Sequence, residues 1–187
     1  HLVRLVDGTQ FDTIYHEHFS YFSFTAAERV FARAQIIAAN ARYTEADGRA
    51  IGEVKTEHLL AGIVLVKDTG AYNELESCGM IEPLMAQLRS QSTINPRDLD
   101  DLVLEAGVDR YKDDPFSRAK ENDLPLSANA QRVVKFSSLT GLKTEQMLER
   151  LREHGVSAKI LAAAESAART REEAKGEAKG EAKGEAK

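Results

Sequence analysis

One hexamer occurs twice in the chain, as KTEHLL at residues 55–60 and, slightly altered, as KTEQML at residues 143–148. Each copy opens an apolar run that ends before a glycine, Gly70 or Gly155, and a second short amphipathic stretch follows. Such an echo indicates that one supersecondary unit is used twice, which constrains the fold more than any single motif does. Because repeated helical units usually build surfaces, the doubled motif favours binding over catalysis.

The composition fits one globular domain with additional segments, because 42% of the 187 residues are hydrophobic and 29% are charged. The formal charge of -5 gives no general reason to expect nucleic acid or an anionic membrane as a partner. A single cysteine, Cys78, rules out an internal disulfide framework and favours a reducing, cytoplasmic setting. No apolar run reaches membrane-spanning length. The first residue is His1 rather than Met, so we expect a fragment or a processed chain.

Changes in composition divide the chain into zones. Residues 1–23 are rich in aromatics and histidine, and we expect an irregular segment there. Residues 24–165 form the predicted helical domain, with one copy of the repeat over 24–91, the other over 125–165, and an acidic linker over 92–124. Apolar residues recur at helical spacing in both copies, whereas strand-like alternation is hard to find. The sequence therefore predicts an all-α fold, a compact bundle of two unequal helical repeats.

Polar residues mark where the helices begin and end. Thr25 has Glu28 three residues later, which is the pattern of a capping box. Gly79 is placed to end the helix that starts after Thr69, and Pro83 is tolerated in the first turn of the next helix. The predicted N-caps are Thr25, Thr56, Thr69, Ser127 and Thr144.

A low-complexity tail, residues 166–187, ends in repeats of Glu-Ala-Lys-Gly. The period of four places like charges at i and i+4, which is repulsive on a helix. Each glycine adds about 1 kcal/mol of helix penalty. We therefore expect a solvated, disordered tail.

The doubled pattern resembles the Clp N-terminal repeat domain of Clp-type AAA+ unfoldases over about residues 24–165. In that family two copies of a helical motif form one compact all-α domain. The resemblance lies in residues 24–30, 56–60 and 75–79 of the first copy, and in residues 126–133 and 144–148 of the second. The two copies differ in spacing, since 27 residues separate Arg29 from Thr56 and 12 separate Arg132 from Thr144. A shortened second copy is expected to leave apolar surface for a partner.

The Clp resemblance implies binding of adaptors and substrates rather than chemistry. It implies no cofactor, and the chain lacks a Walker A loop for nucleotide. The expected partners are protein segments or adaptor proteins, Clp subunits among them, and a second copy of the chain. We expect the partner to contact residues near Thr25, Glu28, Glu57 and Glu145, in a groove between the two helical units.

A second resemblance covers residues 1–34. The string QFDTIYHEHFSYFS at residues 10–23 is similar to a motif of class I SAM-dependent C-methyltransferases that act on nucleotide-linked deoxysugars. That resemblance implies acid/base roles for Glu17 and His18, and imidazole is suited to removing a proton near neutral pH. A glycine-rich strand-to-helix turn for SAM does not follow in this chain. The alternative function is therefore a fragment of such an enzyme, and a chimeric reading frame is a third hypothesis.

The remaining candidate residues favour ordinary structural roles. His16 and His18 share a face only on a strand and have no evident third ligand, so no metal site is predicted. His58 is expected to be a surface or packing histidine, and Cys78 a small buried residue. Arg171, which is interleaved with glutamates, is expected to lie on a solvated helix face.

Overall fold

The computed structural model describes five stretches of the chain: residues 11–40, 52–97, 99–102, 124–134 and 143–184. Within them, side chains are described from residue 26 to residue 174. Residues 1–10 of the N-terminal segment and residues 103–123 of the acidic linker lie outside the described residues.

Helices make up the described fold, and these stretches contain no strand beyond an isolated bridge between Val54 and Leu126. The prediction of an all-α protein is confirmed. The elements in chain order are α2 (Phe11–Asn40), α3 (Thr56–Leu65), α4 (Gly70–Ser77), α5 (Ile81–Arg89), α8 (Ala128–Val134), α9 (Thr144–Leu151) and α10 (Gly155–Gly184).

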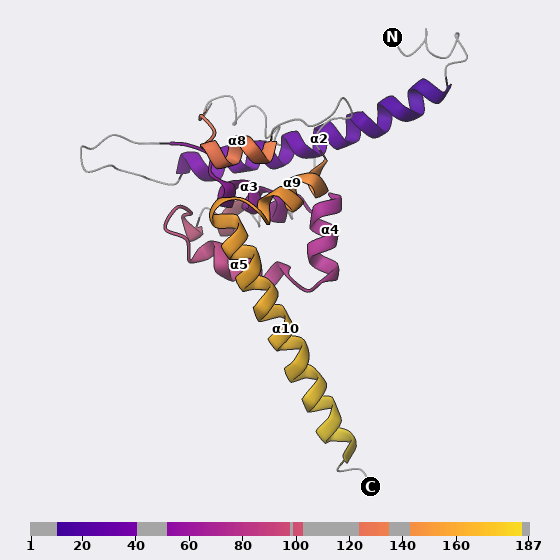
Figure 1. Ribbon diagram of the computed structural model, residues 1–187, viewed down its shortest axis with the longest axis vertical. Helices are drawn as coiled ribbons and strands as arrows, with labels where there is room; N and C mark the ends of the chain where they lie inside the picture. The colour runs from indigo at the N-terminus through magenta and orange to yellow at the C-terminus, as the bar shows by residue number, and fades with distance from the viewer. Residues whose placement is uncertain (1–10, 41–51, 98, 103–123, 135–142, 185–187) are drawn as a thin grey trace, which may run out of the picture.

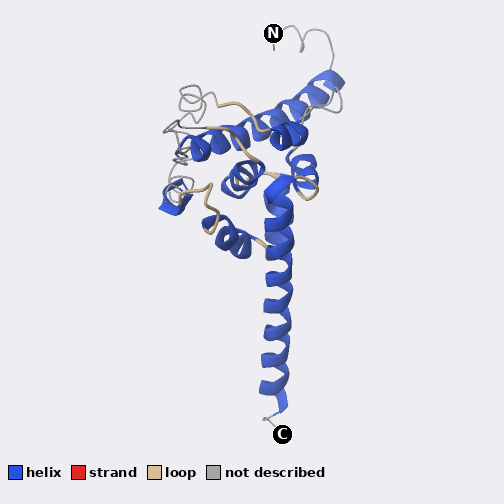
Figure 2. Cartoon of the chain, turned by 60° about the vertical axis from the view of Figure 1, so that its left-hand side comes forward, coloured by secondary structure: helices blue, strands red, loops and turns tan. Residues whose placement is uncertain are grey.

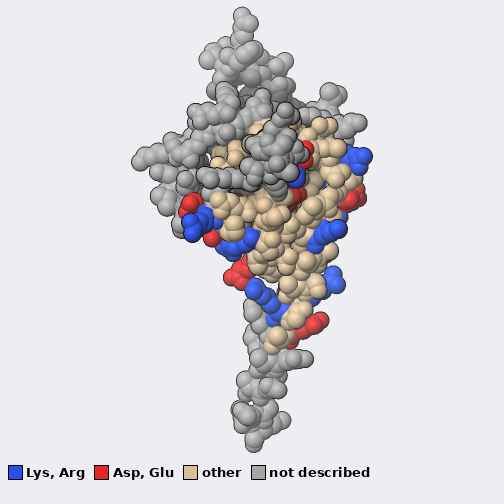
Figure 3. Space-filling model, turned by 90° about the vertical axis from the view of Figure 1, so that its left-hand side faces the viewer, with Lys and Arg blue, Asp and Glu red and all other residues tan. Residues whose placement is uncertain are grey.

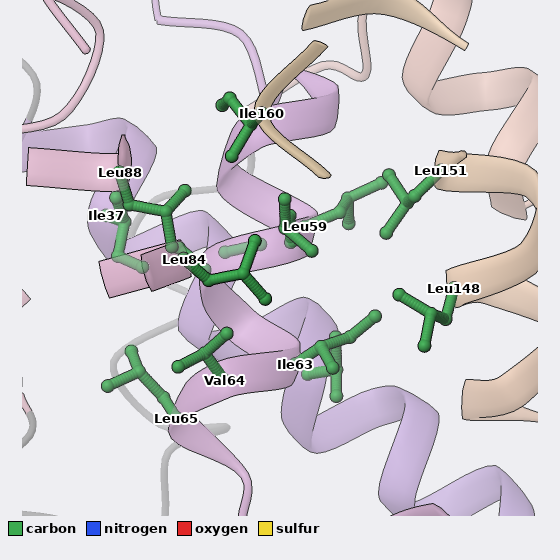
Figure 4. Packing of buried hydrophobic residues seen from close by; sticks show 14 of the residues in the cluster. Ile37, Leu59, Ile63, Val64, Leu65, Leu84, Leu88, Leu148, Leu151 and Ile160 are labelled. Carbon is green, nitrogen blue, oxygen red and sulfur yellow. The ribbon is translucent and has the colours of Figure 1, made fainter. Parts of the chain in front are cut away.

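Helix α3 lies at the centre and contacts α2, α4, α5, α8, α9 and α10 (Figure 1). All of its residues are buried, because its apolar residues run around the whole helix rather than along one stripe. Figure 4 shows Leu59 and Ile63 of α3 pointing toward Leu148 and Leu151 of α9, with Leu84 of α5 on the other side. The first hexamer therefore forms the core of the bundle.

The two copies of the repeat interlock at the N-termini of their helices. The Thr56 hydroxyl, in the first turn of α3, accepts a hydrogen bond from the Ser157 amide of α10 at 3.4 Å. In the same way, the Thr144 hydroxyl of α9 accepts from the Ala71 amide of α4 at 3.5 Å. Each threonine hydroxyl also donates to the glutamate that follows it, at 3.3 Å in both copies. The same bonding pattern at Thr56 and Thr144 gives a physical reason for the repeated Thr-Glu pair.

The glycines that follow each copy allow this close approach. A Cβ built on Gly155, which has φ +69, would lie 2.6 Å from the Thr56 hydroxyl oxygen. A Cβ on Gly70 would lie 1.6 Å from the Glu145 carboxylate oxygen. At Gly155 a larger residue would press on the short Thr56 side chain and strain a left-handed backbone, whereas at Gly70 it would displace the flexible end of Glu145.

Two of the predicted N-caps, Thr69 and Ser127, are correct. At Thr56 and Thr144 the N-cap is instead the residue before the threonine. The Thr69 hydroxyl accepts from the Tyr72 amide at 3.1 Å, and the Ser127 hydroxyl accepts from the Ala130 amide at 3.2 Å. Thr56 and Thr144 are instead the first residues of their helices, which Lys55 and Lys143 precede as N-caps. Their hydroxyls bond to the other copy and are therefore not used as caps.

The chain before α8 is held by the first copy. The Val54 amide donates to the Pro125 carbonyl at 2.8 Å, and the Ser127 amide donates to the Val54 carbonyl at 3.0 Å. The side chain of Gln35 donates to the Leu124 carbonyl and accepts from its amide, at 3.0 and 3.1 Å. These bonds fix where the second copy enters the bundle.

His58 replaces a conventional cap at the start of α3. Its Nδ1 accepts from the Lys55 amide at 3.0 Å, and its Nε2 lies 2.9 Å from the Thr93 carbonyl, to which it donates as the neutral tautomer. Burial lowers its pKa from 6.5; Lys55 adds to this effect, and Glu57 and the hydrogen bonds to backbone oppose it. The expectation of a packing histidine is confirmed.

Two helices are longer than the sequence predicts. The sequence predicts an irregular segment over residues 1–23 and a helix N-cap at Thr25. The first prediction is wrong from residue 11 onward, because α2 begins at Phe11. The second is wrong because Thr25 lies inside α2. Residues 11–40 contain no glycine or proline, so a helix anchored in the core extends backward without a breaker.

The prediction of a disordered C-terminal tail is wrong from residue 166 to residue 184, all of which lies in α10. Alanine, glutamate and lysine are good helix formers, and extending a packed helix costs less than nucleating a new one. Figure 2 shows α10 leaving the body of the molecule as one long rod.

We predict that Gly62→Ala lowers the free energy of unfolding by about 1–3 kcal/mol, because the new methyl group overpacks the α2–α3 contact. A Cβ at Gly62 would lie 2.4 Å from the Val30 carbonyl oxygen, which belongs to a backbone that cannot turn aside. The matched control is Gly70→Ala, where only the mobile end of Glu145 must move. Urea unfolding measures both variants, and equal effects would contradict the predicted packing.

Stability is also expected to depend on pH through His58. Its pKa is lowered in the folded state, so the unfolded state binds more protons as pH falls below 6.5, and stability is lost there. Gln146 occupies the equivalent place in the second hexamer, which makes His58→Gln a conservative, non-titrating control. The free energy of unfolding, measured with urea, should fall between about pH 7.5 and about pH 5.5. This fall should be larger in the wild type than in His58→Gln by about 1 kcal/mol. The same pH dependence in both proteins would show that His58 is not its source.

Candidate functional site

The described surface is hollowed where α5 and α10 pack together beside the end of α3. The main hollow has a volume of about 510 Å³, and clefts of roughly 300–1,000 Å³ are typical of binding sites. A smaller hollow of about 340 Å³ adjoins it, and the two share Tyr72, Ile81, Glu82 and Arg171. We call the two hollows together the α5–α10 groove.

A tight corner between α4 and α5 positions one wall of the groove. The Met80 amide donates to the Leu75 carbonyl and the Gly79 amide donates to the Glu76 carbonyl, both at 2.9 Å. This pair of bonds is a Schellman motif, and it requires the left-handed backbone that Gly79 adopts with φ +65. The prediction that Gly79 ends this helix is confirmed. The corner brings Tyr72 of α4 and the start of α5 to the same side of the molecule.

The floor of the main hollow is aliphatic. It is formed by residues at the end of α3 and along one face of α5: Val64, Leu65, Ile81, Met85 and Ala86. Most of these side chains also belong to the core, whereas Ile81 is half-buried and Ala86 is exposed. The floor therefore offers a limited apolar surface to a side chain from outside. Methionine suits such a place because its side chain adapts to different shapes.

Arg171 and Glu82 form an ion pair across the groove, from α10 to α5, with a separation of 2.8 Å. Their side chains are 58% and 84% exposed. A pair this exposed contributes about 0–1 kcal/mol, so it opens at little cost. Both residues line both hollows, which places the pair at the junction between them.

Charge changes sign along the groove. Beyond the central pair, the main hollow carries Lys67 and Arg89, whereas the smaller hollow carries Glu76 and Glu172. Asp100 engages Arg89 through two hydrogen bonds of 3.0 and 2.7 Å. Lys67 is exposed and has no hydrogen bond or ion pair within the part of the chain that the structure describes. Over the face of the molecule in Figure 3, basic and acidic side chains are interspersed with uncharged surface.

Tyr72 is a hydrogen-bond donor in the groove. Its hydroxyl donates to a carboxylate oxygen of Glu76 at 3.3 Å. Burial and the negative charge of Glu76 raise the pKa of Tyr72, so the phenol stays protonated. A protonated phenol that is already bonded to a carboxylate suits recognition better than proton abstraction.

The predicted binding residues lie on three helices and outside this groove. Glu28 is half-buried on α2, and Glu145 is exposed at the start of α9, where it lies against Gly70. Glu57, near which the sequence predicts a partner contact, is itself buried: the residue is 1% exposed and its carboxylate accepts a hydrogen bond from the Thr56 hydroxyl. Thr25 falls in a part of α2 whose side chains are not described.

The residues of the methyltransferase-like string lie in the first half of α2. Glu17 and His18 are on this helix, and their side chains fall outside the described part. On a helix, positions 16 and 18 are about 200° apart around the axis, so His16 and His18 do not share a face. Among the residues whose side chains are described, no three of the His, Cys, Asp and Glu groups come together as metal ligands.

The described surface differs from two expectations. Cys78 is exposed rather than buried, because it is the C-cap of α4 and lies beside the open Schellman corner. The shortened second copy leaves little apolar surface on the described residues, where Val156, at 40%, is the one large hydrophobic residue that is exposed. The outer face of α4 is instead polar, with exposed Asn73, Glu74 and Glu76.

No known family model, curated protein or solved structure matches this chain. Within the described residues, no helix combines the length and the apolar character needed to cross a membrane.

Sequence reasoning missed the groove because its walls are distant in the chain. Glu82 and Arg171 are 89 residues apart, and neither belongs to a recognisable motif. The sequence predicts that Arg171 lies on a solvated helix face, and Arg171 is indeed exposed on α10. Its ion-pair partner Glu82 could not be inferred, because that contact depends on the direction of α10.

Proposed function

We propose that this chain is a non-catalytic protein-binding domain, comparable to the Clp N-terminal repeat domain, and that it binds a segment of another protein in the α5–α10 groove. The observation that carries the proposal is an aliphatic floor between α3, α5 and α10 that is flanked by exposed, weakly paired charges. Apolar contact with polar groups at the margin is how folded domains usually hold a peptide segment.

The interlocked copies support the same proposal. Two helical units that share one core give a stiff frame, so the groove between α5 and α10 keeps its shape without a ligand. A preformed groove loses less entropy on binding than a flexible one does. The resemblance to Clp N-terminal domains adds adaptors, Clp subunits and a second copy of the chain as candidate partners, and a cytoplasmic setting belongs to this proposal.

The proposal is tested with fluorescently labelled casein, a natively unfolded protein, by anisotropy with the full chain. Casein should bind, and Ala86→Glu should weaken binding by at least about tenfold, because a segment that covers the aliphatic floor would have to bury the new charge. The matched control is Ala162→Glu, which introduces the same charge at an exposed alanine of α10 that does not line the groove.

Absence of casein binding by the wild type would contradict the proposed function. Equal weakening by both alanine variants would contradict the assignment of the binding surface to the groove. Circular dichroism of each variant establishes that it is folded.

A further inference from the structure

We infer that the α5–α10 groove selects acidic segments, in which an apolar side chain is followed by carboxylates, and that Glu82 competes with such a segment for Arg171. The inference rests on the proposed function and names the class of ligand. Three observations carry it: the exposed Lys67, which has no ion pair among the described residues, the exposed Glu82–Arg171 pair, and the change of charge along the groove.

The main hollow has cationic groups on an acidic protein. The whole chain has a formal charge of -5, yet Lys67, Arg89 and Arg171 line this hollow and Glu82 is its one acidic lining residue among the described residues. Asp100 holds Arg89 through two hydrogen bonds, whereas Arg171 has one hydrogen bond to the more exposed Glu82, so Lys67 and Arg171 are the more accessible cations for a ligand carboxylate. Complementary charge favours an acidic segment over a basic one here.

Glu82 occupies the position of a ligand carboxylate. Its carboxylate accepts the Arg171 guanidinium bond at 2.8 Å, while the side chain is 84% exposed. When a ligand carboxylate takes its place, Glu82 remains hydrated, so breaking its ion pair with Arg171 costs little free energy. Arginine can then bind the ligand carboxylate through two parallel N–H groups. The ion pair therefore acts as an internal competitor that lowers the affinity for acidic segments.

The smaller hollow gives the ligand a direction. Glu76 and Glu172 line it, and they repel carboxylates. The acidic residues of a bound segment therefore lie toward Lys67, at the end of α3, and its neutral or basic residues lie toward the α4–α5 corner. The half-buried Ile81 lies at the junction of the two hollows. It contacts the apolar side chain that separates the acidic residues of the segment from its neutral or basic residues.

The test uses the full chain and a fluorescein-labelled peptide, Gly-Ser-Lys-Ser-Leu-Leu-Asp-Glu-Glu-Ser, with anisotropy as the readout. A second peptide has Asn and Gln in place of the acidic residues. The acidic peptide should bind more tightly, with about a 2–5-fold loss for each of Lys67→Glu and Arg171→Gln, as expected for an exposed ion pair. Glu82→Gln should instead tighten binding by about 2–5-fold, because the competitor for Arg171 is removed.

Lys159→Glu is the matched control for overall charge. It makes the same change as Lys67→Glu at an exposed position of α10 that does not line the groove, and it should leave binding unchanged. Equal binding of both peptides, with Ala86→Glu still abolishing it, would overturn the acidic selectivity and leave the proposed function standing. Weaker binding by Glu82→Gln would overturn the role of Glu82 as a competitor. If neither peptide binds and casein does not bind, the proposed function fails as well.

Discussion

The close approach of the first turns of α3 and α10, where the Thr56 hydroxyl accepts from the Ser157 amide and Gly155 lies against Thr56, is the constraint that sets the direction of α10. It fixes the first turn of α10 against the first turn of α3, the most buried helix of the bundle. From that point α10 runs past α5, and its direction brings Arg171 to Glu82. The groove is therefore set by a contact between the two copies, in which Gly155 permits the close approach. The bond between Thr144 and Ala71 repeats the same arrangement on the other side.

The difference between the copies creates the groove. In the first copy, the helix that begins at Gly70 ends after eight residues, and the chain turns at Gly79 into α5. In the second copy, no glycine follows Gly155 until Gly176, so the equivalent helix continues for 30 residues. One copy therefore supplies a corner and the other a straight wall, and the hollow lies between them.

Some local features are predictable from the sequence, whereas the caps expected at Thr25, Thr56 and Thr144 and the long-range features are not. The caps at Thr69 and Ser127 and the stop at Gly79 depend on neighbouring residues, and each was predicted correctly. The ends of α2 and α10 were predicted wrongly, because helix propagation from a packed core outweighs local preferences. The groove depends on residues 89 positions apart, and Glu57 lies in the central helix α3, all of whose residues are buried. Neither leaves a pattern in the surrounding sequence.

Native-state amide hydrogen exchange of Thr56→Val and Thr144→Val tests the interlocking of the copies most directly. Each substitution removes a hydroxyl and leaves a buried amide without its acceptor, at a cost of about 1–3 kcal/mol. The account predicts faster exchange at Ser157 in the first variant and at Ala71 in the second, in each case in the copy that was not changed. Faster exchange confined to the altered helix and its own copy would contradict the account.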